Sequence, residues 1–432
     1  MRLALHWQIL IALALAVLAG LSVGKETVLF GIHFYALFDF IGTIFLNALK
    51  MIIVPLIVSS MISSISGMGN VGDLGRLGGK TIAFYFISSL LAIMVGLTVV
   101  NIIQPGIVDG QPAKEILGSN PADIAEVIEK VDGHSATDIF NIFINMVPAN
   151  IVAAAANGQM LGLIFFSILF GYFITRIDSD AAKTQTRFWQ GIMDVMMEMT
   201  NWIMKFAPIG VFALVAKVIA GIDNEQMDVL AISMGSFTLS VLLALGIHAF
   251  ITLPVILSVV ARVNPLRHYR AMSPALLTAF STASSSATLP LTMECVQERA
   301  GVSNRTSSFV LPLGATVNMD GTALYECVAA MFIAQAYGLE LSLSTQFLIV
   351  TVALLTSIGV AGIPAASLVA ITIILTAIGL PIEAIGLILA VDRILDMFRT
   401  SVNVFSDSCA AVVIAKSEGE QNVLTDKHPA PV

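Results

Sequence analysis

Apolar stretches recur along nearly the whole chain of 432 residues, and each is long enough to cross or enter a bilayer, which takes a helix of about 20 residues. Charged residues make up only 12% of the chain, whereas a soluble domain carries about a quarter. This composition excludes an ordinary soluble globule and predicts an all-α polytopic membrane protein. The ten stretches lie near residues 7–24, 41–66, 81–103, 143–175, 191–221, 229–262, 271–293, 307–336, 346–380 and 384–415.

The lysines and arginines between these stretches alternate between two sides. One side carries 13 of them, whereas the other carries only Lys25, Lys114 and Lys130. Because cytoplasmic loops are enriched in Lys and Arg, we expect both termini in the cytoplasm and the acidic insert 105–140 outside. The net charge of −8 argues against a nucleic-acid partner. We expect the first stretch to be a retained span rather than a cleaved signal.

Two stretches are interrupted by small and polar residues. Residues 281–290 break the stretch 271–293, which has basic flanks, and residues 357–367 break the stretch 346–380, whose flanks lack Lys and Arg. Each is expected to enter and leave on one side, with its tip buried in protein or lining a cavity. The prediction is eight transmembrane helices plus two re-entrant helical hairpins. Two kinked helices with serines at packing interfaces remain the alternative.

The last stretch carries a polar stripe. At about 100° per residue, six polar residues fall within an arc of roughly 100°: Asp392, Asp396, Arg399, Thr400, Asn403 and Asp407. A charge at the bilayer centre costs about 2.5–3.5 kcal/mol, so these groups must be paired, solvated or bound to a ligand. The mixed signs favour a zwitterionic or acidic solute with cations, and a structural ion-pair network is the alternative.

A second polar segment runs from Asn318 to Glu326 inside an apolar stretch. Asn, Asp and Gly are poor helix formers, so local unwinding is expected there. Freed carbonyls with Asn and Asp oxygens are hard ligands that suit Na⁺ better than zinc or copper. Glu326 is a candidate proton carrier, although a hydrogen bond to a neighbouring helix would also explain it. His248, isolated in a span, is interpreted as structural.

These segments resemble the dicarboxylate/amino acid:cation symporter family, which includes the glutamate transporters. The matching motifs are Ala207–Ala213, Ser284–Pro290, Asn318–Thr322, Gly359–Pro364 and Asp396–Asp407, and the resemblance covers nearly the whole chain. It implies a homotrimer with an elevator mechanism in a plasma membrane, which we expect to be a bacterial inner membrane. Residues 1–79 and 141–225 would form a static scaffold, residues 80–104 and 226–416 the moving transport domain, and residues 417–432 a cytoplasmic tail.

The resemblance also implies a substrate site. Arg399 would hold the side-chain carboxylate of the substrate and Asp396 its amino group, while Asn403 and Thr322 would hold the rest. The expected function is secondary active symport of L-glutamate or L-aspartate, driven by Na⁺, H⁺ or both, and a C4-dicarboxylate symporter is the alternative. The candidate substrate-binding residues are Ser285, Ser286, Met319, Thr322, Val360, Gly362, Asp392, Asp396, Arg399, Thr400 and Asn403.

Three sodium sites follow from the same resemblance. Their candidate ligands are Gly314, Asn318, Asn403 and Asp407 for the first, Tyr85, Ser88, Ser89, Asn318 and Asp320 for the second, and carbonyls near Thr316, Ser357 and Ile358 for the third. Glu326 matches a family glutamate that is thought to carry a proton. The chain departs from the family at Ala283 and Met397, one of which is an arginine in relatives, and Arg393 is a candidate substitute.

Two other classes of function are weighed against transport. An intramembrane hydrolase could use Ser284–Ser286, but His248 is the only histidine expected in a span and no G-x-S-x-G elbow is present. The chain is therefore expected not to be an enzyme. An ion channel would show flux that does not depend on an amino acid. The three cysteines are expected to be reduced and packed.

Overall fold

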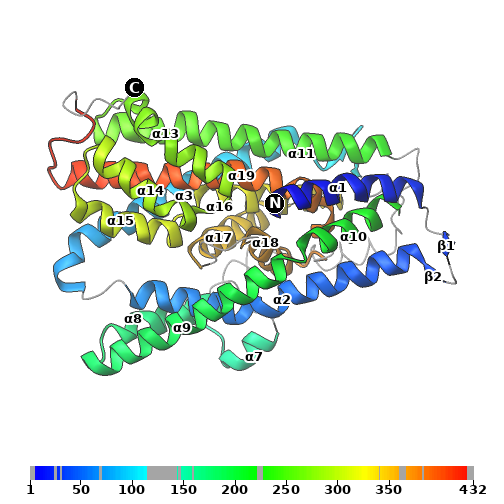
Figure 1. Cartoon of the computed structure of the whole chain (residues 1–432), viewed down its shortest axis with the longest axis horizontal. Helices are drawn as coiled ribbons and strands as arrows, with labels where there is room; N and C mark the ends of the chain where they lie inside the picture. The colour runs from blue at the N-terminus through cyan, green and yellow to red at the C-terminus, as the bar shows by residue number, and fades with distance from the viewer. Residues whose placement is uncertain are drawn as a thin grey trace.

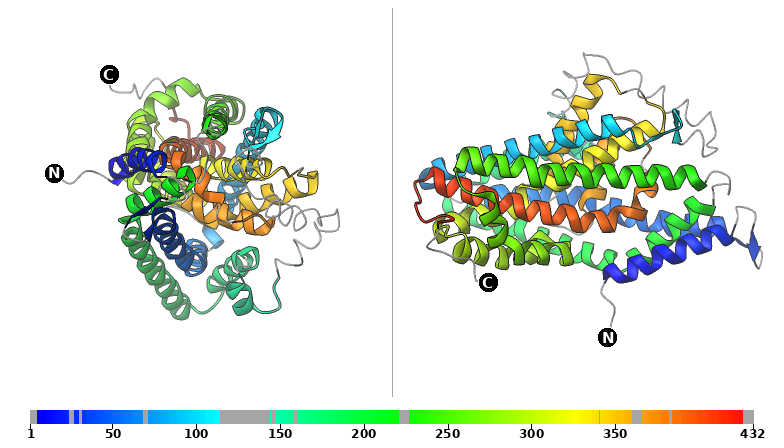
Figure 2. Two further views of the ribbon diagram at one scale, coloured as in Figure 1. Left: turned by 90° about the vertical axis from the view of Figure 1, so that its right-hand side faces the viewer. Right: turned by 90° about the horizontal axis from the view of Figure 1, so that it is seen from above.

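The computed structural model describes residues 5–23, 27–29, 32–67, 71–113, 144, 147–157, 160–220, 227–339, 341–359, 366–381 and 384–425. Long helices dominate this part of the chain, and most run along the long axis of the molecule (Figures 1 and 2). Two antiparallel pairs of two-residue strands accompany them, β1 (Val28–Leu29) with β2 (Ile32–His33) and β3 (Ile107–Val108) with β4 (Gln111–Pro112). The predicted all-α fold is therefore confirmed.

One group of helices comes from the first half of the chain. The helix α1 packs against α10, while α2 packs against α8, α9 and α10. In Figure 1, α2, α8 and α9 lie along the lower side, and α10 and α1 lie above α2. Their bounds are α1 Leu5–Ser22, α2 Phe34–Ser66, α7 Ile151–Ala156, α8 Met160–Ile174, α9 Ser179–Met204 and α10 Ala207–Ala220. They come from the two regions predicted as scaffold.

The second group surrounds α16 and α19. The helix α3 packs against α16 and α11, and α19 packs against α13, α15 and α16. The bounds are α3 Val71–Ile103, α11 Met227–Ile247, α13 Pro265–Thr282, α14 Ser285–Glu294, α15 Asn304–Val317, α16 Asp320–Ala336, α17 Leu343–Gly359, α18 Ala366–Ala377 and α19 Ile385–Ser417. Short π-helical turns and α12 (Leu253–Ile256) extend α11 as far as Ala261.

Both predicted breaks are present. The first falls at Ala283, whose φ of +50° reverses the chain, and the hydroxyl of Ser284 then accepts a hydrogen bond from the amide of Ala287 at the start of α14. The helices α13 and α14 pack together as a hairpin, as do α17 and α18. The tip of the second hairpin, with Val360 and Gly362, lies outside the described residues.

The predicted unwinding at residue 318 is confirmed as well. The helix α15 ends at Val317 and α16 begins at Asp320. Between them, Asn318 is extended, with φ −113° and ψ 93°, and Met319 is also non-helical, with φ −121° and ψ 62°. Every residue of α16 is buried, so this break lies inside the protein. Its peptide groups and side chains are thereby available to a ligand rather than to lipid.

One predicted span is wrong in its outline. The apolar stretch 191–221 is not one helix, because α9 ends at Met204 and α10 starts at Ala207. Pro208 is the cause, since proline has no N–H to continue the helix. Within the described residues, two stretches are long and apolar enough by themselves to cross a membrane, Arg76–Ile103 and Asp228–Ala261. The number of eight spans stays a prediction.

Candidate substrate and cation site

The polar stripe of α19 is buried, as its periodicity indicated. Arg399 is 2% exposed and Asp407 is 3% exposed, although α19 also presents Ile394 and Phe398 at the surface. The helix therefore turns its charges inward, and Arg399 faces Tyr325 of α16. Groups that would be costly in lipid are placed where protein contacts or a ligand can compensate them.

Two arginines and two aspartates form a neutral buried network on α19. Arg399 donates from Nη1 to Asp392 Oδ1 at 3.0 Å, and its Nε and Nη2 both lie 3.0 Å from Asp396 Oδ1. The Nη1 of Arg393 donates to the other oxygen of Asp396, also at 3.0 Å. The guanidinium of Arg399 also lies 4.3 Å from the ring centre of Tyr325, in a cation–π contact.

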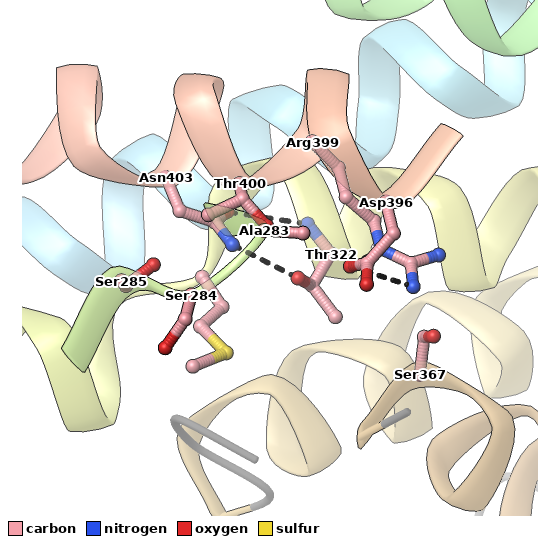
Figure 3. A pocket seen from close by; sticks show the side chains of 10 residues that line it. Ala283, Ser284, Ser285, Thr322, Ser367, Asp396, Arg399, Thr400 and Asn403 are labelled. Carbon is pink, nitrogen blue, oxygen red and sulfur yellow. Dashed lines mark hydrogen bonds and ion pairs between the residues drawn. The ribbon is translucent and has the colours of Figure 1, made fainter. Parts of the chain in front are cut away.

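A small pocket lies between this network and the two hairpins (Figure 3). Asp396, Arg399, Thr400 and Asn403 reach it from α19, and the first hairpin and the start of α16 close other sides. Seven predicted substrate residues line it: Ser285, Met319, Thr322, Asp396, Arg399, Thr400 and Asn403. The sequence reasoning missed three other lining residues, Ala283, Ser284 and Ser367.

Two predicted substrate residues take other positions in this structure. Ser286 is exposed and Asp392 is buried against Arg399, and neither is among the residues that line the pocket. Asp392 therefore orients Arg399 here rather than facing a substrate. Arg393 contacts Asp396 and is likewise not a lining residue, so the candidate substitute arginine reaches the network but not the pocket wall.

The start of α16 is held tightly against α19. The side-chain oxygen of Asn403 accepts hydrogen bonds from the amides of Gly321 at 2.8 Å and Thr322 at 3.3 Å, while its Nδ2 donates to the Thr322 hydroxyl at 3.0 Å. A Cβ at Gly321 would lie 2.5 Å from the backbone oxygen of Arg399. Only glycine permits this approach, which brings Thr322 beside Arg399 in the pocket.

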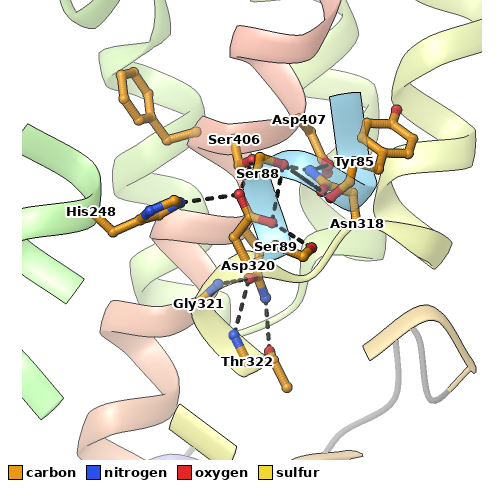
Figure 4. A network of polar contacts seen from close by, with 12 residues as sticks. Tyr85, Ser88, Ser89, His248, Asn318, Asp320, Gly321, Thr322, Ser406 and Asp407 are labelled. Atoms are coloured by element: carbon orange, nitrogen blue, oxygen red, sulfur yellow. Dashed lines mark hydrogen bonds and ion pairs between the residues drawn. The ribbon is translucent and has the colours of Figure 1, made fainter. Parts of the chain in front are cut away.

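A cluster of oxygen atoms lies next to the pocket, around the start of α16 (Figure 4). This oxygen cluster is formed by the side chains of Ser88, Ser89, Asn318, Asp320 and Asp407. Asp320 Oδ1 accepts from Ser89 at 2.7 Å and from Ser88 at 3.3 Å, so α3 meets the start of α16 here. Asn318 donates to Asp407 Oδ1 at 2.9 Å and so links the unwound segment to α19. These residues are between 0% and 3% exposed. Carboxylate, amide and hydroxyl oxygens are the donors that a hard cation prefers.

The predicted sodium ligands are brought together in part. Gly314 faces Asp407 and Tyr85, because a Cβ there would lie 2.5 Å from Asp407 Oδ1 and 2.9 Å from the Tyr85 hydroxyl. The Asn403 side chain instead contacts Gly321 and Thr322 on the pocket side. For the third predicted site, Ser357 is buried in α17, and the side chains of Thr316 and Ile358 lie outside the described part of the chain.

His248 was expected to be structural, but it contacts the oxygen cluster. Its Nε2 lies 3.1 Å from Asp320 Oδ2, and both residues are fully buried. Ser406 donates to the same oxygen at 2.6 Å, so both oxygens of Asp320 are engaged. An isolated histidine in an apolar span was the only signal for this contact in the sequence.

Glu326 is buried about 1.7 turns beyond Asp320 on α16. Its Oε2 accepts a hydrogen bond from the Thr356 hydroxyl of α17 at 3.0 Å, and its Oε1 has no partner among the described residues. The carboxyl group is thus placed between α16 and the second hairpin. The hydrogen bond considered as the alternative is present, but it satisfies only one of the two oxygens.

Broken helices that bring a charged pocket and a hard-donor cluster together define a secondary membrane transporter. The chain belongs to the sodium:dicarboxylate symporter family, whose sequence pattern matches residues 5–417. It is therefore a multi-pass membrane protein of the symporter class.

Known relatives span almost the whole chain. The chain is 36% identical to the proton/sodium-glutamate symport protein of Geobacillus stearothermophilus, with 98% of this chain and 96% of that protein covered. It is 35% identical to the proton/glutamate-aspartate symporter of Escherichia coli K12, with 96% and 93% covered. It is also 36% identical to the neutral amino acid transporter B(0) of Bos taurus, with 87% and 72% covered. Overall identity therefore does not separate acidic from neutral substrates, and the site must.

Proposed function

We propose that the protein is a secondary active symporter that takes up L-glutamate and L-aspartate, driven by gradients of Na⁺, H⁺ or both. The observation that carries this proposal is Arg399, a cation that is 2% exposed and lines a pocket between two helical hairpins. A guanidinium has five N–H donors, and its contacts with Asp392 and Asp396 use three of them. Two donors remain for an incoming carboxylate.

The recognition chemistry follows from this geometry. A carboxylate of the substrate pairs with the free edge of Arg399, a bidentate arrangement that guanidinium favours. Arg399 engages Oδ1 of Asp396 and Arg393 engages Oδ2, and the second lone pair of Oδ2 can accept a hydrogen bond from the ammonium group of an amino acid. Thr322 and Asn403 supply a hydroxyl and an amide beside them. Since the network of two arginines and two aspartates is neutral, an acidic amino acid adds one negative charge, which a cation can balance.

The cations would bind in the oxygen cluster. Asp320, Asp407 and Asn318 offer hard oxygen donors. The hydroxyls of Ser88 and Ser89 both point at the carboxylate of Asp320. The symport proteins of Geobacillus and Escherichia carry proton or sodium in their names, which supports both ions as cargo. Glu326 is the proposed proton carrier because one of its oxygens has no described partner.

We further propose that transport follows an elevator mechanism in a homotrimer. The packing supports the division, since α3, α11 and α13–α19 form the group around α16 and α19, whereas α1, α2 and α8–α10 form a separate group. Both the pocket and the oxygen cluster are built from the group around α16 and α19. A group of helices that contains the whole site can move as a unit without breaking the contacts that form the site.

A C4-dicarboxylate symporter remains the second candidate, and one contact favours it. Both oxygens of Asp396 are engaged by arginines, Oδ1 by Arg399 and Oδ2 by Arg393. These contacts compete with an ammonium group for the carboxylate. A substrate with two carboxylates and no amino group would leave the Asp396–Arg393 pair intact.

Uptake into proteoliposomes distinguishes these functions. Labelled L-aspartate, L-glutamate and succinate are offered under a Na⁺ gradient alone, a pH gradient alone, or neither. We expect accumulation of the amino acids under at least one gradient and none without a gradient. Accumulation of succinate but of neither amino acid would establish the dicarboxylate carrier. An ion flux that does not depend on any of the three substrates would establish a channel.

A further inference from the structure

A cavity of about 520 Å³ lies at the C-terminal end of α19 and shares no lining residue with the substrate pocket. Its walls are the last turn of α19, the residues just after it, and the end of η3 (Leu257–Ala261), the last π-helical turn of the α11 extension. Two cations line it, Lys416 in the last turn of α19 and Arg262 directly after η3. The cavity is thus a basic site between two helix ends, which the proposed transport does not use.

The charges in this cavity are not balanced by the protein. Glu420, the acid among the described lining residues, is already engaged, because its carboxylate accepts hydrogen bonds from the amide and hydroxyl of Ser303 at 2.8 and 2.7 Å and from the hydroxyl of Thr306 at 2.6 Å. The side chains of Arg262 and Lys416 have no hydrogen bond or ion pair in the part of the chain that the structure describes. Two positive charges in one cavity repel each other unless an anion lies between them, so the cavity suits an anionic ligand.

The backbone at Arg262 is a second, independent observation. It is left-handed, with φ of 54° and ψ of 41°, and the amide of Arg262 closes η3 by donating to the carbonyl of Leu257. Glycine is the usual residue at such a helix end, because a residue with a Cβ is strained in this conformation. Arginine is therefore unfavourable here for folding alone, and a strained residue of this kind indicates a use for its side chain.

The position of the cavity in the membrane indicates a lipid as the source of the anion. The apolar stretch Asp228–Ala261 is long enough to cross a bilayer, and its last residues line the cavity. At 1.5 Å per residue its 34 residues exceed the hydrocarbon core of about 30 Å, so its ends reach the level of the lipid headgroups. Ile251, Val255 and Val259 are exposed on successive turns that lead to Arg262. These side chains can contact an acyl chain while the headgroup enters the cavity.

We propose that this cavity binds the phosphate of an anionic phospholipid, with Arg262 and Lys416 as the groups that hold it. Basic pockets between membrane helices bind anionic headgroups in this way. A bound lipid joins the end of the α11 extension to the end of α19, the helix that carries Arg399 in the substrate pocket. The proposal does not depend on which solute the protein transports.

The test measures thermal unfolding of the purified full-length protein in a nonionic detergent while phosphatidylglycerol, phosphatidylcholine or inorganic phosphate is added. We expect phosphatidylglycerol to raise the melting temperature of the wild type in a saturable way, and the other two additives not to do so. Lys416→Gln and Arg262→Gln should each raise the half-saturating concentration of phosphatidylglycerol about fivefold, which is the contribution of one cation near anionic lipid. The matched control is Arg270→Gln, which removes an exposed charge of α13 outside the cavity and should leave that concentration unchanged.

A structural role for the two cations predicts a different pattern. Positive charge is favourable at helix C-termini by itself, so this role would lower the melting temperature without lipid and leave the affinity for phosphatidylglycerol unchanged. Arg262→Gly separates the two roles, because it relieves the left-handed backbone. It should melt at or above the wild-type temperature without lipid, and still lose about fivefold in affinity for phosphatidylglycerol.

Three results would overturn the proposal. Equal stabilisation of the wild type by phosphatidylcholine would show that the ligand need not be anionic. Equal stabilisation by inorganic phosphate would show that the site takes a soluble anion rather than a lipid. Wild-type affinity for phosphatidylglycerol in Lys416→Gln and in both Arg262 variants would show that these cations do not hold the headgroup.

Discussion

Gly321→Ala tests whether the close contact between α16 and α19 builds the site. A Cβ at this position would lie 2.5 Å from the backbone oxygen of Arg399 and 3.1 Å from its Cα. Real Cβ contacts essentially never fall below 3.0 Å and are ordinary from 3.4 Å. The two backbones must therefore separate by about 0.5–0.9 Å, because no flexible side-chain end is available to yield.

That separation acts directly on Asn403. Its bonds to the amides of Gly321 and Thr322 measure 2.8 Å and 3.3 Å, so the longer one would exceed hydrogen-bond length. Overpacking costs about 1–3 kcal/mol, a buried unpaired amide adds about 1–3 kcal/mol, and the better helix propensity of alanine returns about 1 kcal/mol. We expect a net loss of about 1–5 kcal/mol, with aspartate affinity reduced at least tenfold.

The assay pairs thermal unfolding in detergent with calorimetric binding of L-aspartate in saturating Na⁺. Gly235→Ala and Gly246→Ala are matched controls, because a Cβ at either position meets nothing within 4 Å. Both controls should be as stable as the wild type or more so, with unchanged binding. A Gly321→Ala protein with wild-type stability and affinity would show that this contact does not position the site.

Three further outcomes are expected. Arg399→Gln should weaken the binding of aspartate and glutamate by about 2–4 kcal/mol, or roughly 30- to 700-fold. Arg393→Gln should weaken it much less, because Arg393 does not line the pocket. Equal effects of the two substitutions in the same calorimetric titration would contradict this assignment. Glu326→Gln should abolish uptake driven by a pH gradient in proteoliposomes, since glutamine carries no proton, and an unchanged response would exclude Glu326 as the carrier. Glu418 bonds Arg76 at 2.7 Å and Lys80 at 2.6 Å, and these partners lower its pKa from 4.5 to about 2. Because its pKa is lowered in the folded state, Glu418 stabilises that state fully above about pH 4.5 and loses this effect as the pH falls toward 2. The difference in melting temperature between wild type and Glu418→Gln should therefore be constant from pH 8 to 5 and shrink below pH 4. A difference that grew on acidification would contradict the direction of the pKa shift.

The features that the sequence predicted well depend on local pattern. The helical period of α19 was sufficient to place Arg399 and Asp396 on one buried face, because no tertiary information enters that argument. Likewise the poor helix formers Asn, Asp and Gly in the segment that starts at Asn318 predicted the unwound segment. The ligand sets themselves came from the family resemblance rather than from spacing.

The features that were missed depend on which helices meet. Nothing in the sequence around His248 indicates that it faces Asp320, because the two residues lie on different helices and are 72 positions apart. Ser367 fell inside a segment recognised as broken, but its direction depends on where α18 starts. The helix break at residues 205–206 could have been predicted, since Pro208 follows it, and the apolar run concealed it.

Thr322 and Asp320 sit two residues apart on the first turn of α16, one facing the pocket and the other the oxygen cluster. Any displacement of that turn alters both at once, and Asn403 ties it to α19. Thermodynamic linkage then requires reciprocity: the factor by which sodium tightens the hold on aspartate equals the factor by which aspartate tightens the hold on sodium. A single rigid turn would thus couple the two solutes, so that sodium and aspartate each strengthen the binding of the other.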